Sequence, residues 1–204
     1  MAKIILLMGK SASGKDSVMK RVLECNSKVN KLISTTTRPM RKGEVNHKDY
    51  HFVSDDVFDA MEDYELFIET REYNTASGVW RYGKEKEELD LNSKNIYISI
   101  VDIDGAKNII KHAGKENVTC IYLKASPIKR FKRSISRDDM SFIKVKEVLR
   151  RLIADRKDFK CYEDVSPLTL LNNNEEDLDK IINTVNILVV CAMREIGDGN
   201  GKVL

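Results

Sequence analysis

The chain has 204 residues, with 35 Lys or Arg against 32 Asp or Glu, so its formal net charge is only +3. This near balance gives no overall field that would attract nucleic acid or a membrane surface, and no apolar stretch approaches the roughly 18 residues of a membrane span. The four cysteines, Cys25, Cys120, Cys161 and Cys191, form no C-x-x-C pair, which argues against a zinc site or a disulfide framework and favours a reducing, cytoplasmic location.

The first motif lies near the start of the chain. An apolar run, Ile4–Met8, predicts a buried strand, and apolar residues at helical spacing from Val18 to Leu23 predict a helix. The glycine-rich segment between them contains G-x-x-x-x-G-K, the pattern of a phosphate-binding loop, in which backbone N–H groups and the helix dipole point at one anion. We expect the whole segment to bind the phosphates of a nucleotide: Gly9, Lys10, Ser11, Ala12, Ser13, Gly14, Lys15, Asp16 and Ser17.

Asp16 departs from the usual form of this motif, in which a Ser or Thr hydroxyl follows the lysine and touches Mg²⁺. A carboxylate at this position either binds the metal directly or caps the helix while Ser17 or water serves the metal. Its negative charge beside the phosphates is tolerated if a cation lies between them. Asp16 is therefore a candidate metal ligand.

The stretch from Ser34 to Val53 is polar, basic and rich in turn-forming residues. Its arginines suit a doubly charged phosphate, because each planar guanidinium donates two parallel hydrogen bonds. The run Ser-Thr-Thr-Thr-Arg-Pro-Met-Arg-Lys-Gly-Glu at 34–44, followed by Asp-Tyr-His-Phe-Val at 49–53, closely resembles the GMP-binding segment of guanylate kinases. The resemblance implies GMP contacts from Ser34, Arg38, Arg41, Glu44 and Tyr50.

The next segment extends this resemblance. Glu69 follows an apolar stretch at the place of the family's guanine-reading glutamate, and one carboxylate accepts both the N1–H and the exocyclic amine of guanine. Residues 73–84 resemble the family's Tyr-Gly turn but form a longer loop, in which Tyr82 matches the phosphate-binding tyrosine. Lys84 replaces the hydroxyl residue that helps to read the base, which reduces the expected selectivity for guanine.

Two carboxylates follow the predicted strand Asn95–Val101. Asp102 and Asp104 resemble the Asp-x-Asp motif of the same family, and a carboxylate at the end of a strand beside the loop strand is placed to order Mg²⁺ and its water. Asp102 is the first candidate for contact with the metal and with GMP. Asp104 is the second, and its alternative role is to cap the helix that begins near Gly105.

The chain becomes strongly basic after Ser126–Pro127. In guanylate kinases the matching region is a helical lid whose arginines fold over the ATP phosphates. Arg137 and Arg151 correspond best to the two lid arginines, and Arg133 and Arg150 are the alternatives. Acidic residues interrupt the cations and no aromatic platform accompanies them, so nucleic-acid binding is not expected.

Strands that alternate with helices predict an α/β fold with a mainly parallel sheet flanked by helices. Further strands are expected at Val118–Leu123 and Leu168–Leu171, and apolar residues from Ile181 to Ile196 follow one face of a core-packing helix. The resemblance spans nearly the whole chain and implies one P-loop NTPase domain over 1–204. Its expected parts are a core at about 1–33, 91–127 and 162–204, an inserted GMP-binding lobe near 34–90 and a helical lid near 128–161.

The resemblance implies phosphorylation of GMP, and of dGMP, by direct in-line transfer from ATP with Mg²⁺ as cofactor. The acceptor phosphate is mostly dianionic at neutral pH, so no general base is needed. Catalysis then depends on positioning and charge neutralisation by Lys15, Arg38, Arg137 and Arg151. The expected partners are the small molecules ATP and GMP, without nucleic acid or membrane, and the expected assembly is a monomer or a small homo-oligomer.

Two other functions stay open at this point. The sequence Gly-Lys-Asp-Ser at 14–17 resembles the loop of ribose 1,5-bisphosphate kinases, so a sugar phosphate is an alternative acceptor. Some guanylate-kinase-like domains are non-catalytic modules that bind proteins. Those domains usually lack the loop's glycines and lysine, which this chain has at Gly9, Gly14 and Lys15.

Overall fold

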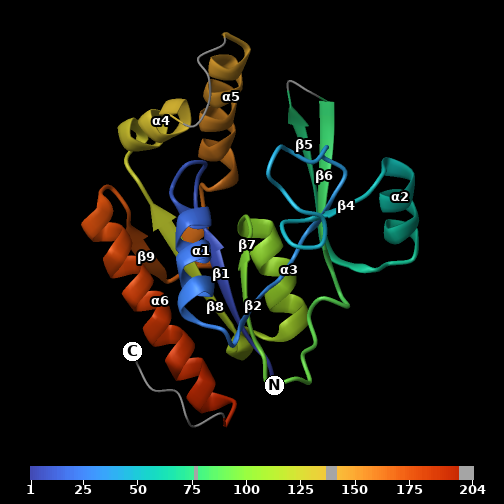
Figure 1. The fold of residues 1–204 in the computed structure, drawn as a ribbon, viewed down its shortest axis with the longest axis vertical. Helices are drawn as coiled ribbons and strands as arrows, with labels where there is room; N and C mark the ends of the chain where they lie inside the picture. The colour runs from blue at the N-terminus through green and yellow to red at the C-terminus, as the bar shows by residue number, and fades with distance from the viewer. Residues whose placement is uncertain (76–77, 137–141, 198–204) are drawn as a thin grey trace.

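A computed structural model of the protein describes residues 1–75, 78–136 and 142–197, and it arranges them as two sheets with flanking helices (Figure 1). The larger sheet has the strand order β2-β7-β1-β8-β9, and all its strand pairs are parallel. Its strands are β1 (Lys3–Met8), β2 (Val29–Lys31), β7 (Ile96–Ile100), β8 (Val118–Lys124) and β9 (Leu168–Leu171). The predicted mainly parallel sheet is thus confirmed, with β2 as a short strand that the hydrophobic pattern did not indicate.

Helices cover both faces of this sheet. They are α1 (Lys15–Cys25), α3 (Ile103–Ala113) and α6 (Glu175–Glu195). Because side chains alternate along a strand, Ile5 and Leu7 of β1 pack with α1 and α6, while Ile4 and Leu6 pack with α3 on the opposite face. Burial on both faces explains why β1 is apolar at every central position.

The smaller sheet has the order β4-β3-β6-β5 and comes from residues within 35–85. The expectation of a long loop at 73–84 is wrong, because β5 and β6 form an antiparallel pair in which Tyr73 lies opposite Trp80 and Tyr82 opposite Arg71. Aromatic side chains opposite one another stabilise such a pair. The elements of this part are β3 (Thr35–Thr36), β4 (His51–Phe52), α2 (Asp55–Asp63), β5 (Phe67–Thr75) and β6 (Gly78–Glu85).

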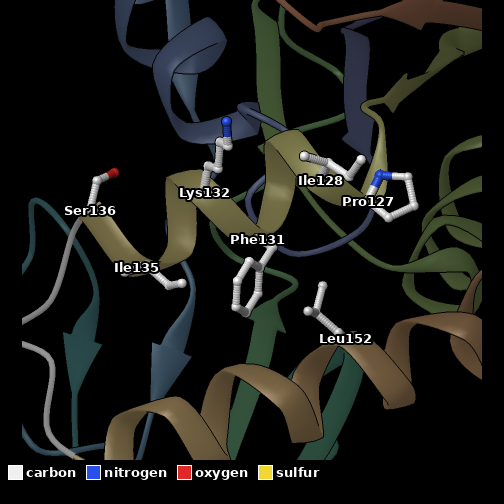
Figure 2. Close-up of a pocket in the computed structure, with 7 residues that line it drawn as sticks. All are labelled: Pro127, Ile128, Phe131, Lys132, Ile135, Ser136 and Leu152. Carbon is white, nitrogen blue, oxygen red and sulfur yellow. The ribbon is translucent and has the colours of Figure 1, made fainter.

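Two further helices, α4 (Pro127–Ser136) and α5 (Phe142–Asp158), lie together at one end of the molecule, across from the β5–β6 pair (Figure 1). Phe131 of α4 points toward Leu152 of α5 in a small apolar pocket between the two helices (Figure 2). Short 3-10 turns occur at Lys115–Asn117 and Tyr162–Asp164. Within the described ranges no helix combines the length and apolar content needed to cross a bilayer.

Phe58 attaches α2 to the smaller sheet. It is fully buried, its ring stacks on Phe67 with centroids 4.7 Å apart, and the guanidinium carbon of Arg81 lies 4.7 Å from the ring centroid. Phe58→Ala removes these contacts and leaves a cavity, so we expect the free energy of unfolding to fall by about 3–5 kcal/mol in urea denaturation. Val57→Ala, at a half-exposed position of the same helix, is the control and should change it by less than about 0.5 kcal/mol. Similar losses for the two variants would contradict this role of Phe58.

Candidate active site

A cleft of about 1290 Å³ is lined by the loop after β1, by the smaller sheet and by α5. Most of the site residues predicted from the sequence line it: Gly9, Ser11, Lys15, Asp16, Ser34, Arg38, Arg41, Glu44, Tyr50, Glu69, Tyr82, Asp102, Arg150 and Arg151. The other predicted loop residues, Lys10, Ala12, Ser13, Gly14 and Ser17, do not line it. Arg137, the second expected lid arginine, falls outside the described residues.

The two loop glycines are required by close backbone packing. Gly9 and Gly14 have φ angles of 147° and 99°, a conformation that L side chains rarely adopt. A Cβ atom at Gly9 would lie 2.5 Å from the carbonyl oxygen of Leu123, and one at Gly14 would lie 2.2 Å from Nδ2 of Asn172. Asn172 also donates a 2.8 Å hydrogen bond to the carbonyl of Ser13. The ends of β8 and β9 therefore hold the loop in shape.

The loop presents hydrogen-bond donors that suit an anion. Nζ of Lys15 donates to the carbonyls of Gly9 and Lys10 at 2.7 and 3.2 Å, so the ammonium lies over the loop. The buried Oγ of Ser13 has no hydrogen-bond partner among the described residues. Asp16 is exposed at the first turn of α1 and belongs to the lining of the cleft.

Arg38 is fixed by Glu44 in a bidentate pair. Its side chain is 3 % exposed, and its Nη1 and Nη2 donate to the two carboxylate oxygens of Glu44 at 3.0 and 2.7 Å. This hydrogen-bonded arginine lowers the pKa of Glu44. Glu44 also accepts a 2.7 Å hydrogen bond from the backbone N–H of Arg41. Glu44 thus orients the guanidinium of Arg38 and the backbone at Arg41, while the direct ligand contact expected from the sequence stays a prediction.

Tyrosine rings form a wall beside Arg38. The guanidinium carbon of Arg38 lies 5.2 Å from the ring centroid of Tyr50, within cation–π range. Tyr82 makes edge contacts with Tyr50 and Tyr73, at centroid separations of 6.0 and 5.6 Å. Burial raises the pKa of Tyr50, and the negative charge of Asp16 contributes to the same shift. Asp16 and this arginine–tyrosine wall line the same cleft.

Glu69 and Lys84 are neighbours across the β5–β6 pair and both are deeply buried. Burial, reinforced by the nearby charge of Asp102, raises the pKa of Glu69 to about 7. Burial also lowers the pKa of Lys84 to about 8, and its Nζ donates a 2.9 Å hydrogen bond to the carbonyl of Leu32. Oε2 of Glu69 accepts no hydrogen bond from the described residues. Nε of Arg71 lies 3.8 Å from this oxygen, so Glu69 has an ion-pair partner but lacks a hydrogen-bond donor, whereas Lys84 already donates to a backbone carbonyl.

Asp102 caps α3, so the N-cap, which was the alternative role of Asp104, belongs to Asp102. Oδ1 of Asp102 accepts a 2.8 Å hydrogen bond from the N–H of Gly105, because an N-cap side chain reaches the N–H three residues ahead. Asp104 lies inside the first turn and is 3.1 Å from Nη2 of Arg71. Oδ2 of Asp102 is 3.1 Å from Nε of Arg71 and accepts from the hydroxyl of Tyr73 at 3.3 Å.

The contacts that Asp102 already makes leave its carboxylate less accessible to a metal ion. A cation, a backbone N–H and a hydroxyl already surround the carboxylate, which leaves Asp16 as the more accessible of the two predicted metal ligands. In the described part of the chain no group of three or more His, Cys, Asp or Glu is arranged to hold a metal ion. A metal in this cleft would therefore take most of its ligands from bound phosphates and water.

Arg71 and Tyr73 line the cleft beside Glu69, although neither is among the site residues predicted from the sequence. Their signal in the sequence is the alternation of residues 69, 71 and 73, which share one face of a strand. The expectation of a loop at 73–84 conceals this alternation.

The arginines of α5 and α4 are held by local partners. Arg150 and Arg151 both pair with Glu147, at 2.8 and 2.9 Å, and the hydrogen bond from Arg150 lowers the pKa of Glu147 to about 2. Arg133 donates to the carbonyl and to Oδ1 of Asn172, at 3.0 and 3.3 Å. Of the predicted lid arginines, Arg150 and Arg151 reach the cleft, and Arg133 supports the residue that holds the loop.

Comparison with known proteins shows which family has a similar sequence. The family model described as guanylate kinase matches residues 1–190. A protein named guanylate kinase from Sulfurimonas denitrificans is 26 % identical to the chain, and the match covers 89 % of the chain and 85 % of that protein. One from Caulobacter vibrioides is 30 % identical, and the match covers 76 % of the chain and 70 % of that protein. One from Tropheryma whipplei is 33 % identical over 53 % of the chain, and the chain spans about half of its length, 55 %.

A solved structure supports the same relationship. The crystal structure of guanylate kinase from Anaplasma phagocytophilum superposes with a TM-score of 0.66 at 25 % sequence identity, covering 92 % of this chain and 86 % of that one. The chain belongs to the guanylate kinase family.

Proposed function

We propose that this protein transfers the γ-phosphoryl group of ATP to GMP, and also to dGMP, forming ADP and the nucleoside diphosphate. The observation that carries the proposal is the cleft itself, which has the phosphate loop on one wall and Arg38, Tyr50 and Glu69 on another. The names of the related proteins support it. The four free cysteines support the reducing cytoplasmic location expected from the sequence.

The acceptor side is suited to a nucleotide phosphate. Arg38 is held rigidly by Glu44, so little side-chain entropy is lost when its guanidinium binds an oxyanion. The backbone N–H of Arg41 is held by the same carboxylate, and Arg41 lines the same cleft. The acceptor phosphate is mostly dianionic at neutral pH and acts as the nucleophile without a base, so these cations orient it and offset its charge.

The donor side supplies positioning and charge. Lys15 and the loop N–H groups would hold the β- and γ-phosphates, with Arg151 and Arg137 closing over the transferring group. Mg²⁺ fits the start of α1, because Asp16 offers an exposed carboxylate to the cleft and Mg²⁺ binds carboxylate, phosphate and water oxygens. When bound, the ion offsets the negative charge shared by Asp16 and the phosphates.

The direct test is an acceptor panel with ATP and GMP, dGMP, IMP, AMP or ribose 1,5-bisphosphate. We expect turnover of GMP and dGMP, with kcat/KM for AMP lower by roughly a hundredfold or more, because adenine cannot satisfy Glu69. Lys15→Met should lower kcat by roughly a hundredfold. Turnover of the sugar phosphate without GMP would overturn the proposal. No turnover of any acceptor, with Lys15→Met binding ATP as well as wild type, would indicate a binding module.

Guanine reading by Glu69 predicts a specific pH dependence. The deprotonated carboxylate accepts from guanine, so kcat/KM for GMP should rise with pH through about 7, the pKa of Glu69 in the free protein. Glu69→Gln should raise the KM for GMP, leave the KM for ATP unchanged and abolish this rise. The second ionisation of the GMP phosphate, with a pKa near 6, affects the pH profiles of both wild type and Glu69→Gln, so it serves as an internal reference.

Glu72→Gln is the matched control, because Glu72 is exposed and lies on the opposite face of the same strand. Equal effects of Glu69→Gln on the KM values for GMP and ATP would contradict the role in base reading.

The position of Asp16 predicts a steep requirement for Mg²⁺. As Mg²⁺ is withdrawn, the activity of wild type should fall more sharply than that of Asp16→Ser, because the carboxylate repels the phosphates unless a cation intervenes. Initial rates against free Mg²⁺ at fixed ATP measure this. Asp179→Ser, which removes the same charge from the exposed face of α6, should behave like wild type. Superimposable Mg²⁺ curves for wild type and Asp16→Ser would argue against the role of Asp16.

A further inference from the structure

A carboxylate from α5 reaches into the phosphate loop. The backbone N–H of Ser11 donates to Oδ2 and Oδ1 of Asp155 at 3.0 and 3.2 Å, and the hydroxyl of Ser11 donates to Oδ1 at 3.1 Å. Asp155 is 6 % exposed, and both it and Ser11 line the cleft, so these partly buried contacts lie at its wall. The carboxylate of Asp155 thus accepts hydrogen bonds from the N–H and O–H groups of the loop, at a position where a phosphate-binding loop binds a phosphate oxygen.

Arg130 of α4 completes the surroundings of this carboxylate. Its Nη2 lies 3.0 Å from Oδ2 of Asp155, the same oxygen that accepts from the Ser11 N–H, and both side chains are more than nine-tenths buried. Nε of Arg130 has no hydrogen-bond partner among the described residues. The guanidinium and the two donors of Ser11 thus converge on one anion position, and the guanidinium keeps an unused donor.

The charges around this position favour a polyanion over a single carboxylate. The ammonium of Lys10 is close enough to Arg130, Asp155 and Arg156 to be influenced by all three. Around Lys10 the cations Arg130, Arg156 and Lys124 thus outnumber the one carboxylate, Asp155, and a nucleotide phosphate chain carries more negative charge than Asp155 does. A phosphate oxygen accepts from Ser11 and Arg130 by the same charge-assisted hydrogen bonds as the carboxylate.

We propose that Asp155 occupies an anion subsite formed by Ser11 and Arg130, that it competes there with the donor phosphates, and that Arg130 is a further phosphate ligand once Asp155 is displaced. This inference rests on the proposed function in that the competing anion is ATP. A different role, in which Asp155 only holds the loop in its binding shape, predicts the opposite sign, because loss of Asp155 would then weaken ATP binding.

The test is titration calorimetry of the full chain with ATP and, separately, with inorganic pyrophosphate. Asp155→Asn keeps the size of the side chain and removes its charge, so we expect about tenfold tighter binding of both ligands. Asp164→Asn is the matched control, because it removes the same charge from an exposed position in the turn after α5 that does not line the cleft. It should change the Kd less than about twofold. Unchanged or weaker binding by Asp155→Asn, or an equal gain for both variants, would overturn the inference.

A double variant tests Arg130. In Arg130→Gln/Asp155→Asn the tighter binding should be lost, whereas a retained gain would exclude Arg130 as a ligand. Asp155→Ala leaves Arg130 without its carboxylate, so pyrophosphate should raise its melting temperature more than it raises that of wild type. Equal increases would count against the subsite.

A measurement on wild type avoids any folding defect of the variants. The side-chain carboxyl ¹³C resonance of Asp155 should move on saturation with pyrophosphate, and an unmoved resonance would contradict displacement. ATP binding is measured without an acceptor, so a failure of the proposed function can be distinguished from a failure of the anion subsite. Wild type that binds ATP but does not phosphorylate GMP would refute the proposed function alone. Wild type that binds neither ATP nor pyrophosphate would overturn both.

Discussion

The close approach of the phosphate loop to the carboxyl ends of β8 and β9 is the constraint on which the site depends. Gly9 passes so near the carbonyl of Leu123, and Gly14 so near Asn172, that neither position has room for a side chain. This contact aims the loop N–H groups at the edge of the sheet where the parallel strands end. Because β7 ends at the same edge, Asp102 and α3 are brought beside the loop. Ligands of open α/β sheets bind at such an edge for the same reason.

Pairs of opposite charge hold the rest of the cleft in shape. Arg38 with Glu44 orients the acceptor side, and Arg130 with Asp155 lies at the phosphate loop. Taking such charges out of water costs free energy that their attraction only partly offsets, so buried pairs contribute little net stability. Their effect is to fix cations where phosphates are expected. A bound phosphate on the acceptor side then finds an oriented guanidinium group. On the donor side Asp155 must first leave Ser11 and Arg130, as we propose above.

Glu69 is a charged group whose burial in the cleft is unfavourable for the protein without a ligand. Its carboxylate is buried next to Asp102, which shifts its pKa toward neutrality, and one oxygen accepts no hydrogen bond in the described structure, with Nε of Arg71 3.8 Å away. A carboxylate kept this way is unfavourable for the free protein and favourable for a ligand that brings its own N–H donors. Lys84 shares the interior with Glu69 and partly offsets its charge, while its own hydrogen bond goes to a backbone carbonyl.

Local patterns determined much of this protein. Gly9–Ser17 and Ser34–Tyr50 could be recognised because their information is contiguous: the turns, the strand and the helix are set by neighbouring residues. The tertiary structure alone decided which distant groups meet. Asp155 lies 144 positions from Ser11, and no pattern along the chain indicates that α5 delivers its carboxylate there. The partner of a buried charge is chosen by how helices pack on the core, and that packing is a property of the whole chain.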